Sequence, residues 1–486
     1  MDYHRFIRKK YNLTDQLNDY LTVRDGFLFY KDINLYQLAQ QYGTPLEVAY
    51  TDMINERVDQ LKSLFKQAIT ASSYPGKFIY AYATKANYYS EVIATALNNC
   101  DAIETSSPYD LYIIEKLVKE NMLGSKKLVI CNGFKTDKYF NKILDLKKLG
   151  VNIIPVLENK KEVDLFINKT KLQFEVGLRV NIEKKAIKLF NANDRLSSNV
   201  ESRFGLYADD LEPAAEQLVR SGHLKLKLFH FHIGGMIENI SRYLEFIDDI
   251  FEHEYCPLAK KFDIKYFDIG GGLPVQYDLK FNFDYKKLVY GLVETIARQA
   301  GRQNITPPSI IGEFGRYTVN DHGFSIFRIN FVKPTQTEDT YWYIINSSLM
   351  NFLPDSWALG QDFVILPLNR WHQDYCRVRL GGMTCDPDDT YYKNEKENIL
   401  YLPKIGDAGR EELLVGVFGV GAYQEMISGV GGVHHCLLPE GTELIVYKKS
   451  GKLHFDRITP LQTPRKVMRI LDYHGHHDLS RYFNTK

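Results

Sequence analysis

The sequence lacks the cysteine spacing and the charge imbalance that mark several protein classes. Its six cysteines stand singly, at Cys100, Cys131, Cys256, Cys376, Cys385 and Cys436. No two of them have the spacing of a zinc site, and they do not form the framework of a secreted disulfide scaffold. The 61 lysines and arginines balance 60 aspartates and glutamates. This near-zero charge gives no reason to expect nucleic acid or an anionic membrane as a partner.

Long apolar runs are also missing. No run is long enough to span a bilayer, and the charged start MDYHRFIRKKYNL is not followed by the apolar core of a signal peptide. Without a disulfide framework or a membrane segment, we expect a soluble protein in the reducing cytoplasm. The 44% hydrophobic content supplies ample core material, and 486 residues suggest either two or three domains or a barrel with a smaller partner domain.

Short apolar runs alternate with amphipathic helical patterns over residues 45–316. The first run, PLEVAY, precedes a helical segment in which Ile54, Val58, Leu61 and Phe65 share one face. Later runs are KFIYAYAT, LVICNGF, NIIPVLE, FEVGLRVNI, LKLFHFHIG, KYFDIGGG and PSIIGEFGR. Strands that alternate with helices form parallel units, and about eight units over about 270 residues predict a (β/α)8 barrel.

The pattern changes after Arg316. Runs such as FSIFRINFVKP, TYWYIIN, CRVRLGG, LLVGVFGV and TELIVYKK are rich in β-formers and are separated by Gly, Pro and Asp. They predict an antiparallel β domain over residues 317–486. The segment GFLFYKDINL within residues 1–44 is also strand-like, so we expect the N-terminal segment to complete that domain.

Chemically active side chains stand at the ends of the expected barrel strands, where barrel enzymes place their sites. They are Lys85, Glu104, Asn132, Arg179, His232, Gly270 to Gly272, Glu313 and Arg316. Taken singly, each has an ordinary explanation, such as a surface lysine, a tight turn, a packed histidine or a loop ion pair. Together they suit pyridoxal phosphate: the lysine forms a Schiff base, the carboxylate keeps the ring nitrogen protonated, and glycine amides bind phosphate.

Six short segments carry a resemblance to a known family: YATKAN, FHIGG, DIGGG, GEFGR, TCD and GAYQE. Over nearly its whole length the chain resembles the fold-type III pyridoxal phosphate decarboxylases of basic amino acids, which are related to alanine racemase. The resemblance implies that Lys85 binds the cofactor covalently and that His232 lies over the ring. It also implies that Glu313 meets the ring nitrogen and that Arg316 lies near the phosphate with Gly270, Gly271 and Gly272. The chain departs from the family at Gly235, where the family has serine.

The resemblance extends to the β domain. It implies that Cys385 reprotonates the α-carbon, that Asp386 meets the distal cation of the substrate, and that Tyr423 contacts the phosphate. In this family the TCD segment reaches into the partner subunit, so we expect a homodimer with shared active sites. Asp388 and Asp389 lie beside Asp386, and such an acidic group is costly to bury unless it is solvated or faces a cation.

Further segments of the chain bear on the identity of the substrate. VICNGFK, LPDSWALGQDFVILPLNR and GAYQE resemble biosynthetic arginine decarboxylases, which implies conversion of arginine to agmatine in polyamine biosynthesis. YATKAN is instead closer to diaminopimelate decarboxylases, although those usually carry CES where this chain has TCD. Diaminopimelate, ornithine and lysine therefore stay open as substrates.

Two other functions stay open on the same fold. A racemase would want a tyrosine acid on the opposite face of the ring, where this chain offers Cys385. An inactive regulatory homologue would tend to lose cofactor ligands, and here they are present. The C-terminal segment YHGHHDLSRYF suggests a metal site through His474, His476 and His477, but no second cluster completes one and we expect no metal.

Overall fold

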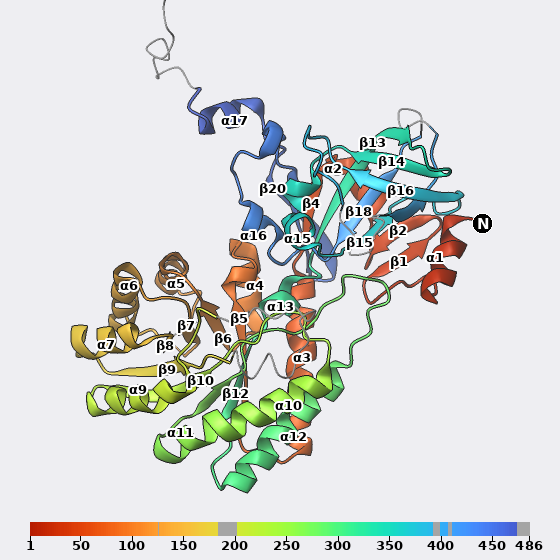
Figure 1. The fold of residues 1–486 in the computed structure, drawn as a ribbon. Coiled ribbons are helices and arrows are strands. Elements are labelled where there is room, and N and C mark those ends of the chain that lie inside the picture. The colour runs from red at the N-terminus through yellow and green to blue at the C-terminus, as the bar shows by residue number, and fades with distance from the viewer. Residues whose placement is uncertain (125, 183–201, 392–398, 407–410, 474–486) are drawn as a thin grey trace, which may run out of the picture. The chain divides into compact units, whose positions relative to one another are not determined.

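The computed structural model describes residues 1–124, 126–182, 202–391, 399–406 and 411–473 (Figure 1). His474, His476 and His477 of the C-terminal segment lie outside these residues. The chain divides into two units. We call Met53–Val275 with Asn282–Val319 the barrel unit, and Met1–Asp52 with Gln276–Phe281 and Asn320–Lys486 the β unit.

The barrel unit contains a closed barrel of eight parallel strands, which confirms the expected fold class. The strands follow one another around the barrel as β5 (Phe78–Ala83), β6 (Ala102–Thr105), β7 (Leu128–Cys131), β8 (Ile153–Leu157), β9 (Phe174–Arg179), β10 (Leu224–His230), β11 (Tyr266–Asp268) and β12 (Ser309–Glu313), and β12 pairs with β5. Most of these strands are continuous apolar runs, because a parallel strand in a barrel is buried on both faces.

One expected barrel strand belongs elsewhere. PLEVAY forms β4 (Leu46–Tyr50), which pairs with strands of the β unit, and the short β6 takes its place in the barrel. The exposure of β4 alternates along the strand, as in a strand buried on one face. β6 has the sequence AIET, and its two polar residues keep it from standing out as an apolar run.

Helices alternate with the barrel strands (Figure 1). In chain order they are α3 (Asp52–Ala71), α4 (Ser90–Asn99), α5 (Pro108–Lys119), α6 (Asp137–Lys148), α7 (Lys160–Lys169), α9 (Ala208–Arg220), α10 (Ile240–Ile250), α11 (Cys256–Lys261), α12 (Tyr285–Gln303) and α13 (Gly315–Val319). The predicted face of α3 is confirmed, because Ile54, Val58, Leu61 and Phe65 are all buried. Side chains from the strands fill a common core that includes Ala81, Ala102, Leu128, Ile130, Ile154, Val156, Leu228 and Ile311.

The β unit is built on a mixed sheet of nine strands in which most neighbours are antiparallel. Seven strands run in the order β17 (Leu400–Pro403), β16 (Tyr375–Gly381), β14 (Thr340–Ile345), β13 (Gly323–Pro334), β4, β19 (Thr442–Lys449) and β20 (Lys452–Thr459). β18 (Leu414–Phe418) pairs with β13 and with β15 (Val364–Pro367). The pairs β14–β16 and β4–β19 are parallel.

The N-terminal segment completes this unit, as expected, but it does so in two ways. β4 enters the large sheet, whereas β1 (Leu21–Arg24), β2 (Phe27–Tyr30) and β3 (Ile33–Asn34) form a separate three-stranded sheet. The small sheet is tied to the unit because Leu28 N–H donates to the Leu368 carbonyl at 2.9 Å and Tyr30 Oη donates to the Asp321 carbonyl at 2.6 Å.

Short helices complete the β unit: α1 (Tyr3–Tyr11), α2 (Leu35–Tyr42), α14 (Leu349–Phe352), α15 (Pro354–Leu359), α16 (Gln424–Ser428) and α17 (Pro464–Ile470). Over the described residues of both units, every helix is too short or too polar to traverse a lipid bilayer.

Candidate active site

Lys85 lies directly beyond a barrel strand. The last four residues of β5 are buried, and a short 3₁₀ turn, Thr84–Ala86, follows the strand. Thr84 Oγ1 donates to the Glu104 carbonyl at 3.1 Å and so fixes the turn against β6. The Lys85 side chain is 40% exposed, and its Nζ lies 3.5 Å from Oε2 of the fully buried Glu104. Because β5 ends here, the Lys85 amine stands at the C-terminal mouth of the barrel, as the sequence predicts.

A buried polar cluster lies at the same end of the barrel. We call Glu104, Asn132, His230, Asp268 and Glu313 the buried cluster. Asn132 Nδ2 donates to Glu313 Oε1 at 2.7 Å and to Glu104 Oε1 at 3.0 Å, and so links β6 to β12. His230 Nδ1 lies 3.4 Å from Asp268 Oδ2 and 3.9 Å from Glu313 Oε1.

The buried cluster is poor in counter-charge. Burial raises the pKa of the Glu313 carboxyl to about 8, and the nearby Asp268 and Glu104 carboxylates add to this rise. Burial also raises the pKa of Asp268 to about 7, although hydrogen bonds with Gly270 N–H and Glu313 oppose this rise. Burial also lowers the pKa of His230 to about 4, so its imidazole is neutral at physiological pH. At neutral pH the apo cluster therefore retains protons that exposed carboxyls would have released.

Several atoms of the buried cluster have no hydrogen-bond partner. They are Glu104 Oε2, Asn132 Oδ1, His230 Nδ1 and Asp268 Oδ2. Three of these atoms still have a polar neighbour, because Glu104 Oε2 lies 3.5 Å from Lys85 Nζ, and His230 Nδ1 and Asp268 Oδ2 lie 3.4 Å apart. Buried atoms without a hydrogen bond are rare, and they indicate a site that a proton or a ligand completes. The ligand atoms of His230, Asp268 and Glu313 also lie within 4.8 Å of one another, so this group can hold a proton or a cation.

A glycine turn lies between the cluster and His232. Gly270 N–H donates to Asp268 Oδ1 at 2.9 Å, and Gly271 N–H donates to His232 Nδ1 at 3.2 Å. The second bond makes Nδ1 an acceptor, so the neutral His232 ring carries its proton on Nε2. Burial and the nearby Lys85 lower the pKa of His232, which keeps the ring neutral. Two of the three amides expected to bind phosphate therefore already hold side chains of the site in place.

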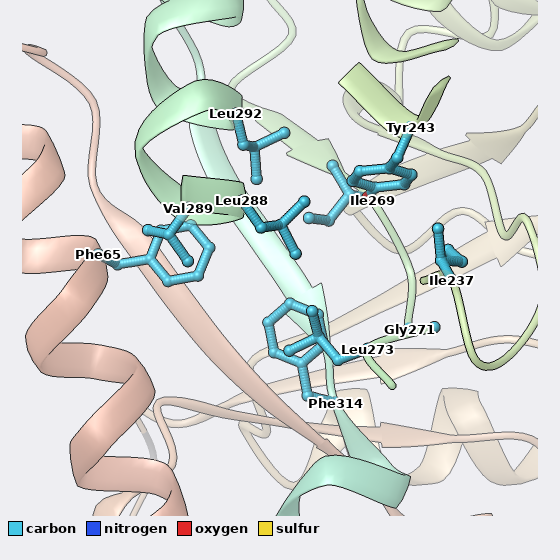
Figure 2. Close-up of a pocket in the computed structure, with 11 residues that line it drawn as sticks. Phe65, Ile237, Tyr243, Ile269, Gly271, Leu273, Leu288, Val289, Leu292 and Phe314 are labelled. Atoms are coloured by element: carbon cyan, nitrogen blue, oxygen red, sulfur yellow. The ribbon is translucent and has the colours of Figure 1, made fainter. Parts of the chain in front are cut away.

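The glycines are required for steric reasons. A Cβ on Gly270, which has a φ of +63°, would lie 2.7 Å from the Phe231 carbonyl oxygen, and one on Gly271 would lie 2.8 Å from that of Glu313. Beside the turn, Gly271 borders an apolar pocket lined by side chains such as Tyr243, Leu273, Leu288 and Phe314 (Figure 2). This pocket has no charged lining group, so it supports the turn and does not suit a charged ligand.

The remaining barrel residues occupy defined places. Arg179 Nη1 pairs with the buried Glu158 Oε1 at 3.2 Å, and Gly133 N–H donates to the same oxygen at 2.8 Å. These contacts hold the Arg179 side chain at the ends of β7 and β8. Arg316 lies in the first turn of α13, directly after β12 and Phe314.

Cys385, Asp386 and Tyr423 belong to the β unit. Cys385 and Asp386 lie in the loop of residues 382–391, which follows β16, and Cys385 is exposed. Asp386 Oδ1 accepts a hydrogen bond from Asp388 N–H at 2.9 Å, and its Oδ2 lies 3.5 Å from His435 Nε2. Tyr423 precedes α16 with a φ of +72°, a conformation that is rare outside glycine.

Asp389 differs from the other acids of this loop, because it is buried and fully engaged. Its two carboxylate oxygens accept five hydrogen bonds, from Ser348 Oγ, Leu349 N–H, Met350 N–H, Thr384 N–H and Thr384 Oγ1. These bonds, not solvent or a cation, account for its burial. Asp389 therefore holds the loop together and is not available to a substrate.

The chain is similar to known proteins in sequence and in fold. Residues 54–320 match a family model described as pyridoxal-dependent decarboxylase, pyridoxal binding domain. The biosynthetic arginine decarboxylase of Pseudomonas aeruginosa is 25% identical over an alignment that covers 90% of this chain and 85% of that protein.

Two solved structures show the same fold. A biosynthetic arginine decarboxylase from Campylobacter jejuni has a TM-score of 0.80 at 19% identity, covering 99% of this chain and 93% of that one. A diaminopimelate decarboxylase from M. jannaschii, in complex with L-lysine, has a TM-score of 0.74 at 20% identity, covering 93% and 97%.

Proposed function

From the premise that this chain belongs to the pyridoxal-dependent decarboxylases, we propose that it decarboxylates a basic amino acid, preferentially arginine, to give agmatine. The observation that carries the proposal is the pairing of an exposed lysine at the barrel mouth with a buried, proton-holding carboxylate cluster behind it. The arginine assignment is supported by relatives named biosynthetic arginine decarboxylase that align over most of this chain.

The barrel mouth fits pyridoxal phosphate. The amine of Lys85 is accessible for a covalent link, and the buried Glu313 carboxyl, which keeps its proton at neutral pH, suits a ring nitrogen that has to stay protonated. The glycine turn packs directly against the Phe231 and Glu313 carbonyls and so lies at the same end of the barrel as Glu313. When bound, the cofactor supplies an electron sink for the pair left by the departing carboxylate.

We assign the chain's own residues as follows. Glu313 holds a proton at the ring nitrogen, and Asn132 keeps its carboxylate in place through the 2.7 Å hydrogen bond. The neutral His232, whose orientation is fixed by Gly271 N–H, would contact the face of the ring. Gly270 to Gly272, Arg316 and Tyr423 would hold the phosphate. In the β unit, Cys385 delivers the proton to the α-carbon, and Asp386 meets the distal cation.

The preference for arginine rests on hydrogen-bond geometry. A carboxylate can accept two parallel hydrogen bonds from a guanidinium, which an ammonium cannot match. Asp386 has this role in the proposal, because Asp389 is engaged within its loop and Asp388 is exposed. We further propose that the enzyme acts in the cytoplasm, in polyamine biosynthesis, as a homodimer that shares its active sites.

Carbon dioxide release from a substrate panel tests this proposal. Arginine, ornithine, lysine and meso-diaminopimelate are compared, in D and L forms where they exist, with Lys85→Ala as the inactive control. We expect the highest kcat/KM with one form of arginine. A preference for ornithine or lysine would overturn only the guanidinium argument, a preference for diaminopimelate would overturn the role of Asp386, and racemisation without gas release would overturn the reaction type.

A further inference from the structure

Two thiols of the β unit face each other across two loops. Cys385 lies in the loop after β16, and Cys436 lies in a 3₁₀ turn, His435–Leu437, ahead of β19. Their Sγ atoms are 3.5 Å apart although the residues are 51 positions apart in the sequence. Both cysteines are exposed, whereas Cys100, Cys131, Cys256 and Cys376 are buried.

Hydrogen bonds and ion pairs within and between the two loops hold the loops in place. Asp389 fixes the Cys385 loop through Thr384, the residue next to Cys385. On the other side, His434 Nε2 lies 3.2 Å from Glu440 Oε1, and the same oxygen accepts from Gly431 N–H. The loops also meet directly, because His435 Nε2 lies 3.5 Å from Asp386 Oδ2.

The backbone at Cys436 is unusual. Cys436 has a φ of +56° and Leu437 a φ of +54°, both in the left-handed region that residues other than glycine rarely adopt. Such conformations persist only where the surroundings impose them, and they gather at functional segments. Here the conformation accompanies a side chain that reaches the thiol of Cys385.

We propose that Cys385 and Cys436 form a reversible intramolecular disulfide, which makes this pair a covalent modification site for low-molecular-weight disulfides such as oxidised glutathione. A disulfide needs an S–S distance of about 2 Å, so closure requires only a small movement of two exposed side chains. Its effect on catalysis rests on the proposed function, because the bond removes the thiol assigned as proton donor.

The chemistry balances in two exchange steps. The thiolate of Cys385 attacks oxidised glutathione, forms a mixed disulfide and releases one glutathione thiolate. The thiolate of Cys436 then attacks the Cys385 sulfur and releases the second. Two protein thiols lose two electrons and two protons in total, and one glutathione disulfide becomes two glutathione thiols.

The environments of the six thiols differ, and they leave this pair the most accessible to disulfide exchange. Burial raises the pKa of the Cys100 and Cys131 thiols to about 12 and that of Cys256 to about 11, so those thiols are both inaccessible and protonated. The contact with Cys436, and the negative charge of Asp386, also raise the pKa of Cys385. Disulfide formation should therefore speed up as the pH rises above neutrality.

The test equilibrates the cofactor-loaded enzyme with defined mixtures of reduced and oxidised glutathione. Peptide mass spectrometry without reduction should find one cross-linked peptide joining Cys385 and Cys436, 2 Da lighter than the two thiol peptides, and two thiols fewer per chain. Activity should fall by roughly a hundredfold or more, the scale of losing a proton donor, and dithiothreitol should restore it.

Two variants serve as matched controls. Cys436→Ser should keep basal activity and give a glutathione adduct on Cys385 in place of the cross-link, whereas Cys256→Ala should cross-link like the wild type. A stable glutathione adduct on wild-type Cys385, or a disulfide between chains, would overturn the proposal. A cross-link that leaves activity unchanged would uphold the modification site and overturn the role of Cys385 as proton donor.

Discussion

At the scale of single residues, the buried cluster ties stability to pH. Asp268 and Glu313 have raised pKa values in the folded apo-protein, so the folded state keeps protons that the unfolded chain releases above about pH 4. The contribution of Asp268 and Glu313 to the free energy of unfolding is therefore most favourable below that pH. It is lost as the pH rises toward the pKa values of the folded state. Each unit of pKa difference corresponds to about 1.4 kcal/mol.

We predict that Asp268→Asn in the apo-protein removes part of this dependence. Asparagine can still accept the hydrogen bond from Gly270 N–H but cannot ionise. Relative to wild type, the variant should gain stability between pH 5 and pH 8, measured by thermal melting at each pH. Asp209→Asn, at the exposed start of α9, is the matched control and should follow the wild type. Parallel wild-type and Asp268→Asn curves would contradict the prediction.

Gly235 gives a second prediction at this scale. A Cβ at this position meets no atom within 4 Å, so the serine that the family carries there fits without strain. Gly235→Ser should lower the Kd for pyridoxal phosphate by roughly fivefold, the worth of one net hydrogen bond of about 1 kcal/mol. Cofactor titration of the apo-protein measures this, and Gly235→Ala separates the hydroxyl from the added methyl group. Equal Kd values for the serine and alanine variants would rule out the hydroxyl contact.

The residues predicted at strand ends include Lys85, Glu104, Asn132 and Glu313 but not two members of the buried cluster. These two, His230 and Asp268, are the last residues of β10 and β11, and the predicted residues His232 and Gly270 lie just after them. The HFH segment could have indicated His230, because residues two apart in a strand share one face and His232 was already a predicted site residue. The Asn132–Glu313 bond was not predictable, because it crosses the barrel mouth between strands that are not neighbours.

At the scale of elements, a single carboxylate organises the loop that carries Cys385. Asp389→Ala would leave the buried amide of Leu349 and its neighbours without an acceptor, and we expect a loss of roughly 3 kcal/mol in the free energy of unfolding. Asp388→Ala, at an exposed position of the same loop, should change it by less than about 0.5 kcal/mol. Urea denaturation measures both, and equal effects would show that the loop does not depend on Asp389.

The number of barrel strands was predictable from the alternation of apolar runs and helical patterns. Which segments form those strands was not predictable. β4 and the barrel strands are both short and apolar, and only pairing partners distinguish them. A local pattern specifies that a segment is a strand, whereas its sheet is decided by contacts with residues hundreds of positions away. The domain limits expected at residues 44/45 and 316/317 stay predictions.

At the scale of the whole molecule, the proposed shared sites predict complementation between inactive chains. Lys85→Ala and Cys385→Ala each lose one required group, but a mixed dimer holds one intact site. After subunit exchange, about a quarter of wild-type activity should return, because half of random dimers are mixed and each has one working site of two. Carbon dioxide release measures the recovery, with exchange verified by mass. No recovery would place both residues in the site of one chain.

The central position of β4 in the large sheet has a consequence for biosynthesis. β4 pairs with β13 on one side and with β19 on the other, so Val48 lies opposite Leu444. These partners are roughly 400 residues apart, and contacts of such long range make folding slow. On the ribosome, the β4 segment emerges early and its second partner among the last, with the whole barrel sequence made in between. The barrel can close while synthesis continues, but both edges of β4 stay unpaired until β13 is made, and one edge stays unpaired until β19 is released. This is the interval in which the nascent chain most needs protection from aggregation.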